Sequence, residues 1–216
     1  MIGVLAYGSL IADYSWEIER RRTGTIPEVW TPFPVEYARR SSTRGDAPTL
    51  VPVPPGCGSP VKAVILVMKK FSHKDAIQNY LYRREMHAVG DTTKVYNHEV
   101  QLHRRNAMQI ETIPDFQGLE VVYCTVFPAN FTEILDPGRT PQEKALLLAQ
   151  AAIDSLTADT YPNGIDGIQY LITNSAVGVI TPLTDLYKHA ILRLADNETD
   201  LAETRLRIAR QKGIIG

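Results

Sequence analysis

Residues 61–68 read Val-Lys-Ala-Val-Ile-Leu-Val-Met, the clearest candidate for a buried strand in the sequence. A nearly continuous apolar run of this length, rich in β-branched residues, predicts a strand that is covered on both faces. The chain then changes character, because Ser72 can cap a helix and Asp75 stands three residues later, the spacing of a capping box. We therefore expect a buried strand followed by a helix that ends at about Glu85 or His87.

Strand candidates fill the first two thirds of the chain and helix candidates fill the last third. The sequence Thr140-Pro141-Gln142-Glu143 is a strong helix start, because it combines a capping residue, a proline at the first helical position and a glutamate in the capping-box position. Strands are expected at residues 2–7, in the second half of 30–38, and at 49–53, 99–102, 107–111 and 121–127. Helices are expected at 140–156, 168–174, 183–194 and 200–211, and a helical turn at 13–22 with Trp16 on its apolar side.

This order of elements predicts the α+β class with an antiparallel or mixed sheet. We expect one domain over residues 1–216, with a strand-rich part at 1–130 and a helical C-terminal extension at 140–216. A single domain of this length is common among barrels and mixed folds.

Composition excludes several classes of function. The chain has 216 residues, of which 44% are hydrophobic, and its 23 basic and 24 acidic residues are spread along it. No basic stripe is present to contact phosphates, which argues against nucleic acid as a partner. No apolar run approaches the roughly 18 residues of a membrane span, and no signal peptide is evident. The two cysteines do not suggest a disulfide scaffold, so the cytoplasm is the predicted location.

The first candidate site is the bend Tyr7-Gly8-Ser9-Leu10, which directly follows the first strand. Glycine allows a positive φ and lets a ligand approach the backbone closely. Exposed N–H groups on such a turn can bind a carboxylate or a developing oxyanion. The alternative is a plain strand-ending turn. A nucleophilic Ser9 is a weaker hypothesis, because the G-x-S-x-G pattern is not present.

The second candidate is Glu85 at the end of the predicted helix. Ile77 and Leu81 define the apolar face of that helix, and Glu85 falls one turn after Leu81, at its margin. Burial at such a margin raises the pKa of a carboxyl group, which suits a group that accepts and returns a proton. A pairing with Arg83 or Arg84 would act in the opposite direction. The alternative is a surface glutamate in an ordinary helical ion pair.

A third candidate is the loop at residues 39–45, where arginines such as Arg44 could hold the carboxylate of a substrate. The alternative is a set of solvated arginines. The histidines show no metal-ligand spacing, and His98 and His103 are expected to point to opposite faces of a strand. No phosphate-binding glycine motif is present, so we expect neither a metal nor a nucleotide cofactor.

Taken in order, these motifs resemble the γ-glutamylcyclotransferase superfamily, and within it the ChaC-like branch. The bend is similar to the Y-G-S-L signature that follows the first strand of the family. Residues 80–85 are similar to Y-L-x-x-R-E, whose glutamate is the catalytic residue of the family. Two further matches are Thr43-Arg44-Gly45 ahead of Thr49-Leu50, similar to an R-G pair before a T-L strand, and Tyr170-Leu171 in the C-terminal helices.

The resemblance implies a small β-barrel with flanking helices and a reaction that needs no cofactor. In that reaction the α-amine of a γ-glutamyl peptide or amine, with glutathione among the candidates, attacks its own γ-carbonyl and releases 5-oxoproline. Glu85 would be the catalytic acid and base, Gly8, Ser9 and Leu10 would bind the substrate through their N–H groups, and Tyr7 would line the pocket. Two alternatives stay open: a binding protein on the same fold without turnover, and a serine acyl-hydrolase that uses Ser9. The sequence leaves the oligomeric state open.

Overall fold

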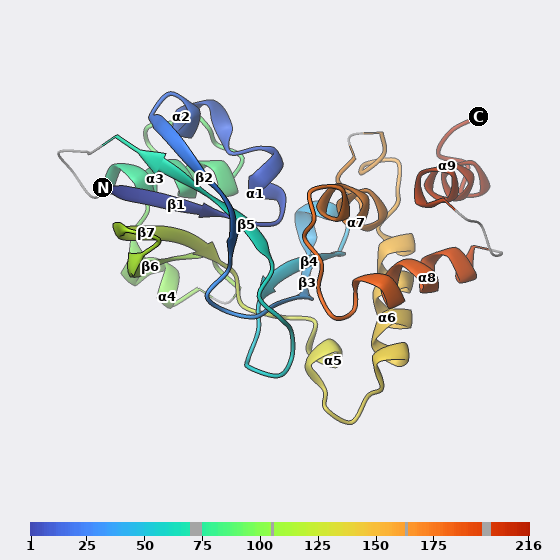
Figure 1. Cartoon of the computed structure of the whole chain (residues 1–216). Helices are drawn as coiled ribbons and strands as arrows, with labels where there is room; N and C mark the ends of the chain where they lie inside the picture. Colours follow the sequence, from blue (N-terminus) through green and yellow to red (C-terminus); the bar gives the residue numbers. More distant parts are fainter. Residues whose placement is uncertain (70–74, 105, 163, 196–199) are drawn as a thin grey trace. The chain divides into compact units, whose positions relative to one another are not determined.

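The computed structural model describes residues 1–69, 75–104, 106–162, 164–195 and 200–216. The protein belongs to the α+β class (Figure 1). The described chain forms two compact units, each built from two stretches of sequence. The first unit comprises Met1–Pro32 and Lys62–Pro128, and the second comprises Phe33–Val61 and Ala129–Gly216. The single domain over residues 1–216 stays a prediction.

The first unit is built on a five-stranded mixed sheet with the order β2-β5-β1-β7-β6. The central strand β1 runs antiparallel to β5 and parallel to β7. The strands are β1 Ile2–Ala6, β2 Arg22–Trp30, β5 Lys62–Met68, β6 Gln109–Phe116 and β7 Leu119–Val126. The helices are α1 Ser9–Ala12, α2 Ser15–Glu19, α3 Asp75–Glu85 and α4 His98–Leu102. Among the described residues the sheet is open, with β2 and β6 at its edges, so the small barrel implied by the resemblance is not shown.

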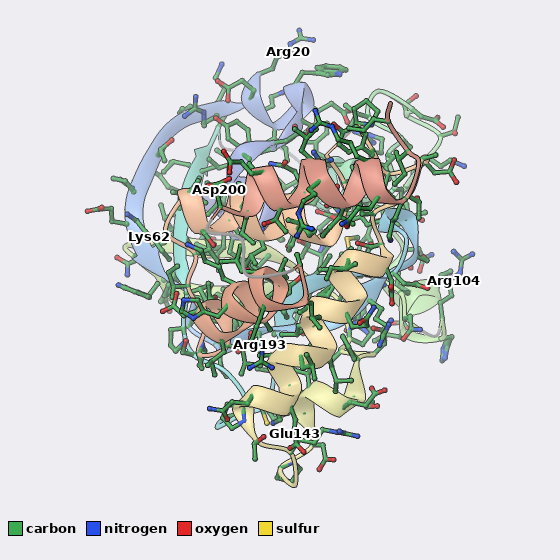
Figure 2. All side chains as sticks on the ribbon, turned by 90° about the vertical axis from the view of Figure 1, so that its right-hand side faces the viewer. Arg20, Lys62, Arg104, Glu143, Arg193 and Asp200 are labelled. Carbon is green, nitrogen blue, oxygen red and sulfur yellow. The ribbon has the colours of Figure 1, made fainter. Side chains whose placement is uncertain are left out.

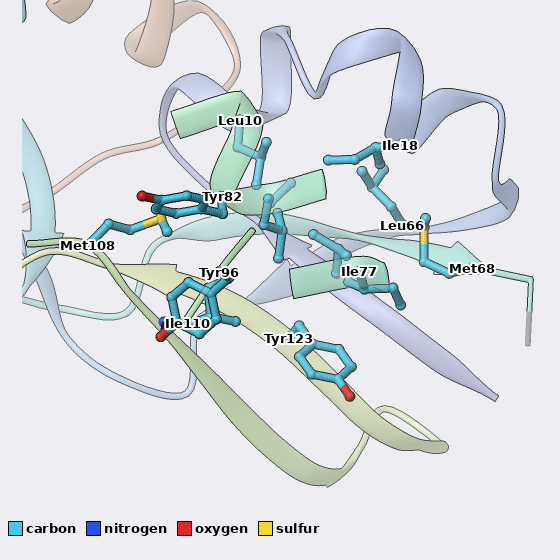
Figure 3. Packing of buried hydrophobic residues seen from close by; sticks show 13 residues of the cluster. Leu10, Ile18, Leu66, Met68, Ile77, Tyr82, Tyr96, Met108, Ile110 and Tyr123 are labelled. Carbon is cyan, nitrogen blue, oxygen red and sulfur yellow. Dashed lines mark hydrogen bonds between the residues drawn. The ribbon is translucent and has the colours of Figure 1, made fainter. Parts of the chain in front are cut away.

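The core of the first unit lies where α2 and α3 pack against the sheet. Ile77 and Leu81, the predicted apolar face of α3, are buried in one cluster with Leu66 of β5 and Ile18 of α2 (Figure 3). Leu10 of α1 belongs to the same cluster. Burying apolar side chains of this size stabilises the fold by about 1.5–3 kcal/mol each. The core therefore fixes both the bend after β1 and the helix that carries Glu85.

The second unit pairs a two-stranded antiparallel sheet with helices. The strands are β3 Val35–Ser41 and β4 Ala47–Pro52, joined by the short 3-10 helix η1 Ser42–Arg44. The helices are α5 Thr132–Leu135, α6 Pro141–Asp154, α7 Gly167–Ala176, α8 Thr184–Leu194 and α9 Leu201–Gln211. The capping box predicted at Thr140 and Glu143 is confirmed at the start of α6, and Asp200 caps α9 (Glu143 and Asp200 are labelled in Figure 2).

Several predicted elements need correction. Residues 99–102 lie in helix α4 and not in a strand, because the side chain of Asn97 accepts a hydrogen bond from the N–H of Val100 and caps a helical turn. Strand β2 was not predicted, since an edge strand with alternating half-buried residues shows no apolar run. The helical turn expected within 13–22 is confirmed as α2, but Trp16 is 53% exposed instead of lying on an apolar face.

Ser72 and the side chain of Asp75, the expected capping box of α3, lie outside the described residues. Among the described helices, none combines the length and the hydropathy of a membrane span.

Candidate functional site

The bend after β1 has a backbone conformation that requires glycine. Gly8 has φ 60° and ψ −139°, a combination that side chains with a Cβ rarely adopt. Gly8 also precedes the short helix α1, in which the N–H of Ile11 donates to the carbonyl of Gly8 at 3.1 Å. The chain therefore turns sharply at Gly8, and the N–H groups of Ser9 and Leu10 stand in the first turn of α1, where a helix supplies no partner of its own.

The residues around Gly8 hold the bend in place. The hydroxyl of Tyr7 donates to the carbonyl of Thr125 in β7 at 3.0 Å. The side chain of Leu10 is buried in the core cluster. Tyr7 and Ser9 themselves are half-buried. Because the bend is anchored on both sides, its backbone is a rigid platform next to the sheet.

Glu85 is the last residue of α3, as the sequence predicted for the end of this helix. Its side chain is 13% exposed, and that of Arg84 is 12% exposed. The two are joined by an ion pair in which Nη1 of Arg84 donates to Oε1 of Glu85 at 2.7 Å. The carboxylate therefore lies at the half-buried margin that the helix periodicity predicted, with one strong donor beside it, and not at the fully exposed surface position of the alternative.

The same guanidinium of Arg84 also reaches the bend. Its Nη2 donates to the hydroxyl of Ser9 at 3.4 Å, and its Nε donates to the carbonyl of Asp13 at 3.0 Å. One side chain thus contacts both the carboxylate of Glu85 and the serine that follows Gly8. Two sequence-predicted site regions, 75 residues apart in the chain, are brought into one cluster.

The charges in this cluster decide what it can do chemically. Arginine stays protonated in proteins and only donates hydrogen bonds. The ion pair therefore places a positive charge directly against the carboxyl group of Glu85. Ser9 receives its hydrogen bond from a group that cannot take up a proton, so this contact does not activate it as a nucleophile.

From the sequence, Arg84 is expected to act on Glu85 only through its charge. The structure adds a second role, because Arg84 connects Glu85 to Ser9. The adjacency of Arg84 and Glu85 is visible in the sequence. The contact of Arg84 with Ser9 cannot be predicted from the sequence, because it depends on how α3 packs beside α1.

Arg44 belongs to the second unit, whereas Glu85 and the bend belong to the first. It is the last residue of η1, and its guanidinium lies over the ring of Tyr170 at 5.1 Å from the ring centroid. The assignment of Arg44 to a substrate carboxylate stays a prediction.

We next consider the histidine, cysteine and acidic side chains of the described residues as metal ligands or nucleophiles. Within the described ranges, no three His, Cys, Asp or Glu side chains are grouped to hold a metal ion. His98 lies in helix α4 and not on a strand, so the expectation that it and His103 face opposite sides of a strand is wrong. The thiol of Cys124 is buried, which raises its pKa to about 12 and makes it a poor nucleophile.

Comparison with known proteins found no matching family model, no similar curated protein and no similar solved structure.

Proposed function

We propose that this protein is a γ-glutamylcyclotransferase of the ChaC-like kind, which releases 5-oxoproline from a small γ-glutamyl peptide or amine. One observation carries the proposal: Arg84 joins the largely buried carboxylate of Glu85 to Ser9 in the glycine bend. A carboxylate close to backbone N–H groups is the minimum that this cyclisation needs, since the reaction is intramolecular and requires neither a metal nor a redox cofactor.

The proposed reaction forms one bond and breaks another. The α-amine of the substrate attacks its own γ-carbonyl, which forms the C–N bond of a five-membered lactam. The C–N bond to the leaving amine then breaks. Glu85 accepts a first proton from the α-ammonium, which frees the amine for attack, and passes it to the leaving nitrogen. The attacking nitrogen loses a second proton as the lactam forms, and the departing amine takes up this proton as well and leaves as an ammonium ion. Glu85 therefore ends the cycle as the carboxylate with which it began.

The bend supplies the second half of the proposed site. N–H groups at Ser9 and Leu10 stand in the first turn of α1 and would donate to the γ-carbonyl oxygen as it becomes negative. Gly8 permits the substrate to approach the backbone, and Tyr7 would line the pocket.

The small barrel with flanking helices that the resemblance implies belongs to this proposal. The proposal also keeps what length, charge and cysteine content indicated, which is a single domain in the cytoplasm with neither nucleic acid nor a membrane as its partner.

The proposal is tested by incubating the protein with a panel of γ-glutamyl compounds, including glutathione and γ-glutamyl amino acids, and measuring 5-oxoproline. The wild type is expected to release it from at least one of them. Glu85→Gln is expected to remain folded and to lose this activity by a factor of about 100 or more, as removal of a general base does.

Glu19→Gln is the matched control for that variant. Glu19 also ends a helix and also pairs with an arginine, Arg22, at 2.7 Å, but this pair is on the surface. Its loss should leave 5-oxoproline release unchanged. Absence of 5-oxoproline from every donor, with saturable binding of γ-glutamyl compounds, would instead identify a binding protein without turnover.

A further inference from the structure

A second ion pair lies one residue before the candidate site and is more buried than the first. Nη2 of Arg83 donates to Oε1 of Glu17 at 2.7 Å, and Nε of Arg83 donates to both carboxylate oxygens at 3.1 Å. The two side chains are 6% and 5% exposed. Nη1 of Arg83 reaches the carbonyl of Lys94 at 3.4 Å, and the guanidinium lies 5.0 Å from the centroid of the Tyr80 ring.

A buried ion pair of this kind does not by itself explain stability. Removing two charges from water costs several kcal/mol per ion, and well-packed apolar side chains often stabilise a core as well or better. What the pair does provide is a defined geometry, because a bidentate arginine fixes both distance and orientation. The question is which geometry Arg83 and Glu17 fix.

Arg83 and Arg84 hold the same segment of the chain at two points. Consecutive side chains leave a helix about 100° apart, so the two arginines project in different directions from the last turn of α3. Arg84 donates to Ser9 and to Asp13, and Arg83 donates to Glu17. Residues 9–17, which comprise α1 and the start of α2, are therefore attached to α3 at both ends.

Glu85 follows these two arginines directly, so its position depends on how they hold the last turn of α3. A rotation or shift of the last turn of α3 would displace its carboxylate from the bend, and the contacts of Arg83 with Glu17 oppose it. Arg84 alone opposes it less, because its bond to Ser9 is long at 3.4 Å and its bond to the carbonyl of Asp13, at 3.0 Å, is exposed to solvent.

We propose that the Glu17–Arg83 ion pair is a positioning pair, which fixes the last turn of α3 so that the carboxylate of Glu85 faces the bend at Gly8 and Ser9. Neither side chain takes part in the reaction. The inference rests on the proposed function for its catalytic consequence, but the positioning itself does not depend on it.

The test uses two variants of the pair and a surface control. Arg83→Lys keeps the positive charge but loses the bidentate contact with the carboxylate of Glu17. Glu17→Gln with Arg83→Met removes both charges together, which avoids leaving one of them buried alone. Arg22→Lys is the control, because its bond to Glu19 has the same length but lies on the surface.

In steady-state kinetics with the best γ-glutamyl donor, both pair variants are expected to lower kcat by about 10- to 100-fold while KM changes little, as displacement of a catalytic group does. Arg22→Lys should match the wild type. Folding of each variant is checked by circular dichroism and thermal unfolding. A folded pair variant with the wild-type kcat would overturn the proposal.

A second measurement separates this inference from the proposed function. With carboxyl-labelled glutamate, the ¹³C signal of Glu85 is assigned as the one that disappears in Glu85→Gln. Its chemical shift at fixed pH should move in both pair variants and stay in place in Arg22→Lys. The chemical shift of Glu85 can be measured even if the wild type releases no 5-oxoproline. If it moves in the pair variants of such an inactive protein, the proposed function fails and the positioning pair stands. An unmoved signal in folded pair variants rejects the positioning pair whatever the activity.

Discussion

Arg84 donates a hydrogen bond from Nη2 to the hydroxyl of Ser9 across 75 residues of sequence. The bond is long at 3.4 Å, but the other end of the same guanidinium pairs with Glu85 at 2.7 Å. Arginine is suited to this task because its planar fork presents several donors in a fixed arrangement, whereas lysine presents a single point charge. One rigid group therefore bridges the carboxylate of Glu85 and the bend.

This relationship predicts the effect of Arg84→Lys. The positive charge remains beside Glu85, but a single ammonium group cannot contact Glu85, Ser9 and Asp13 together. We expect the variant to fold and its kcat for 5-oxoproline release to fall by about 10-fold or more, as loss of positioning does. The assay is 5-oxoproline release with Arg22→Lys as control. Full activity in Arg84→Lys would mean that charge alone is sufficient at this position.

Ser9→Ala distinguishes a positioning role of the serine from a nucleophilic one. Because Ser9 accepts from an arginine, we expect its hydroxyl to help to orient Arg84 and to form no covalent intermediate. The variant should retain activity within about 10-fold of the wild type, which is what one neutral hydrogen bond of about 1 kcal/mol can account for. A serine-reactive fluorophosphonate should label neither protein. Complete loss of activity in Ser9→Ala together with labelling of the wild type would favour the acyl-hydrolase.

Gly8→Ala tests the conformation of the bend. At φ 60° and ψ −139° an added Cβ is strained, and such strain costs about 1–3 kcal/mol. The midpoint of urea unfolding should fall accordingly. Gly24→Ala is the control, since Gly24 in β2 has ordinary backbone angles and a Cβ there would meet only Val67, at 4.0 Å. That change should stay within about 0.5 kcal/mol. Equal effects of the two substitutions would show that Gly8 is not required by its backbone angles.

Much of the fold could be predicted from local signals. Strand β5 was evident because its apolar run has no competing pattern, and α6 was evident because its capping box and Pro141 coincide. Strand β2 and helix α4 gave no such signal. β2 is an edge strand with register shifts, and α4 has only five residues and depends on the cap at Asn97. An irregular edge strand and a five-residue helix form because the rest of the unit holds them.

The candidate site could be predicted residue by residue but not as an arrangement. The positions of Gly8 and Glu85 followed from strand and helix periodicity. The bridge through Arg84 and the buried pair of Arg83 with Glu17 could not be predicted, because each joins segments at least 66 residues apart. Which of two neighbouring arginines points inward depends on packing between α2 and α3, which the sequence pattern does not specify.

A pH-dependent stability of the second unit is the last prediction. Glu36 of β3 is fully buried and accepts hydrogen bonds from the hydroxyl of Thr181 at 2.6 Å, the N–H of Tyr37 at 2.8 Å and the N–H of Leu183 at 3.3 Å. Burial raises the pKa of Glu36 from 4.5 to about 7, although these hydrogen bonds act in the opposite direction. The folded protein therefore binds this proton more tightly than the unfolded chain.

The sign of the effect follows from that difference. Between pH 4.5 and about 7 the folded state keeps the proton of Glu36 while the unfolded state has lost it, so the free energy of unfolding falls as the pH rises through this window. The loss amounts to at most about 3 kcal/mol and levels off above pH 7. Urea unfolding followed by circular dichroism at several pH values measures it.

Glu36→Gln isolates the contribution of this carboxyl group, because histidines also titrate in the same range. The glutamine cannot ionise and can still accept from Thr181, so the fall in unfolding free energy between pH 4.5 and 7 should be smaller in the variant by the amount that Glu36 contributes. If both proteins show the same pH dependence, Glu36 does not carry a shifted proton, and the burial of its carboxyl group must be compensated by its three hydrogen-bond donors.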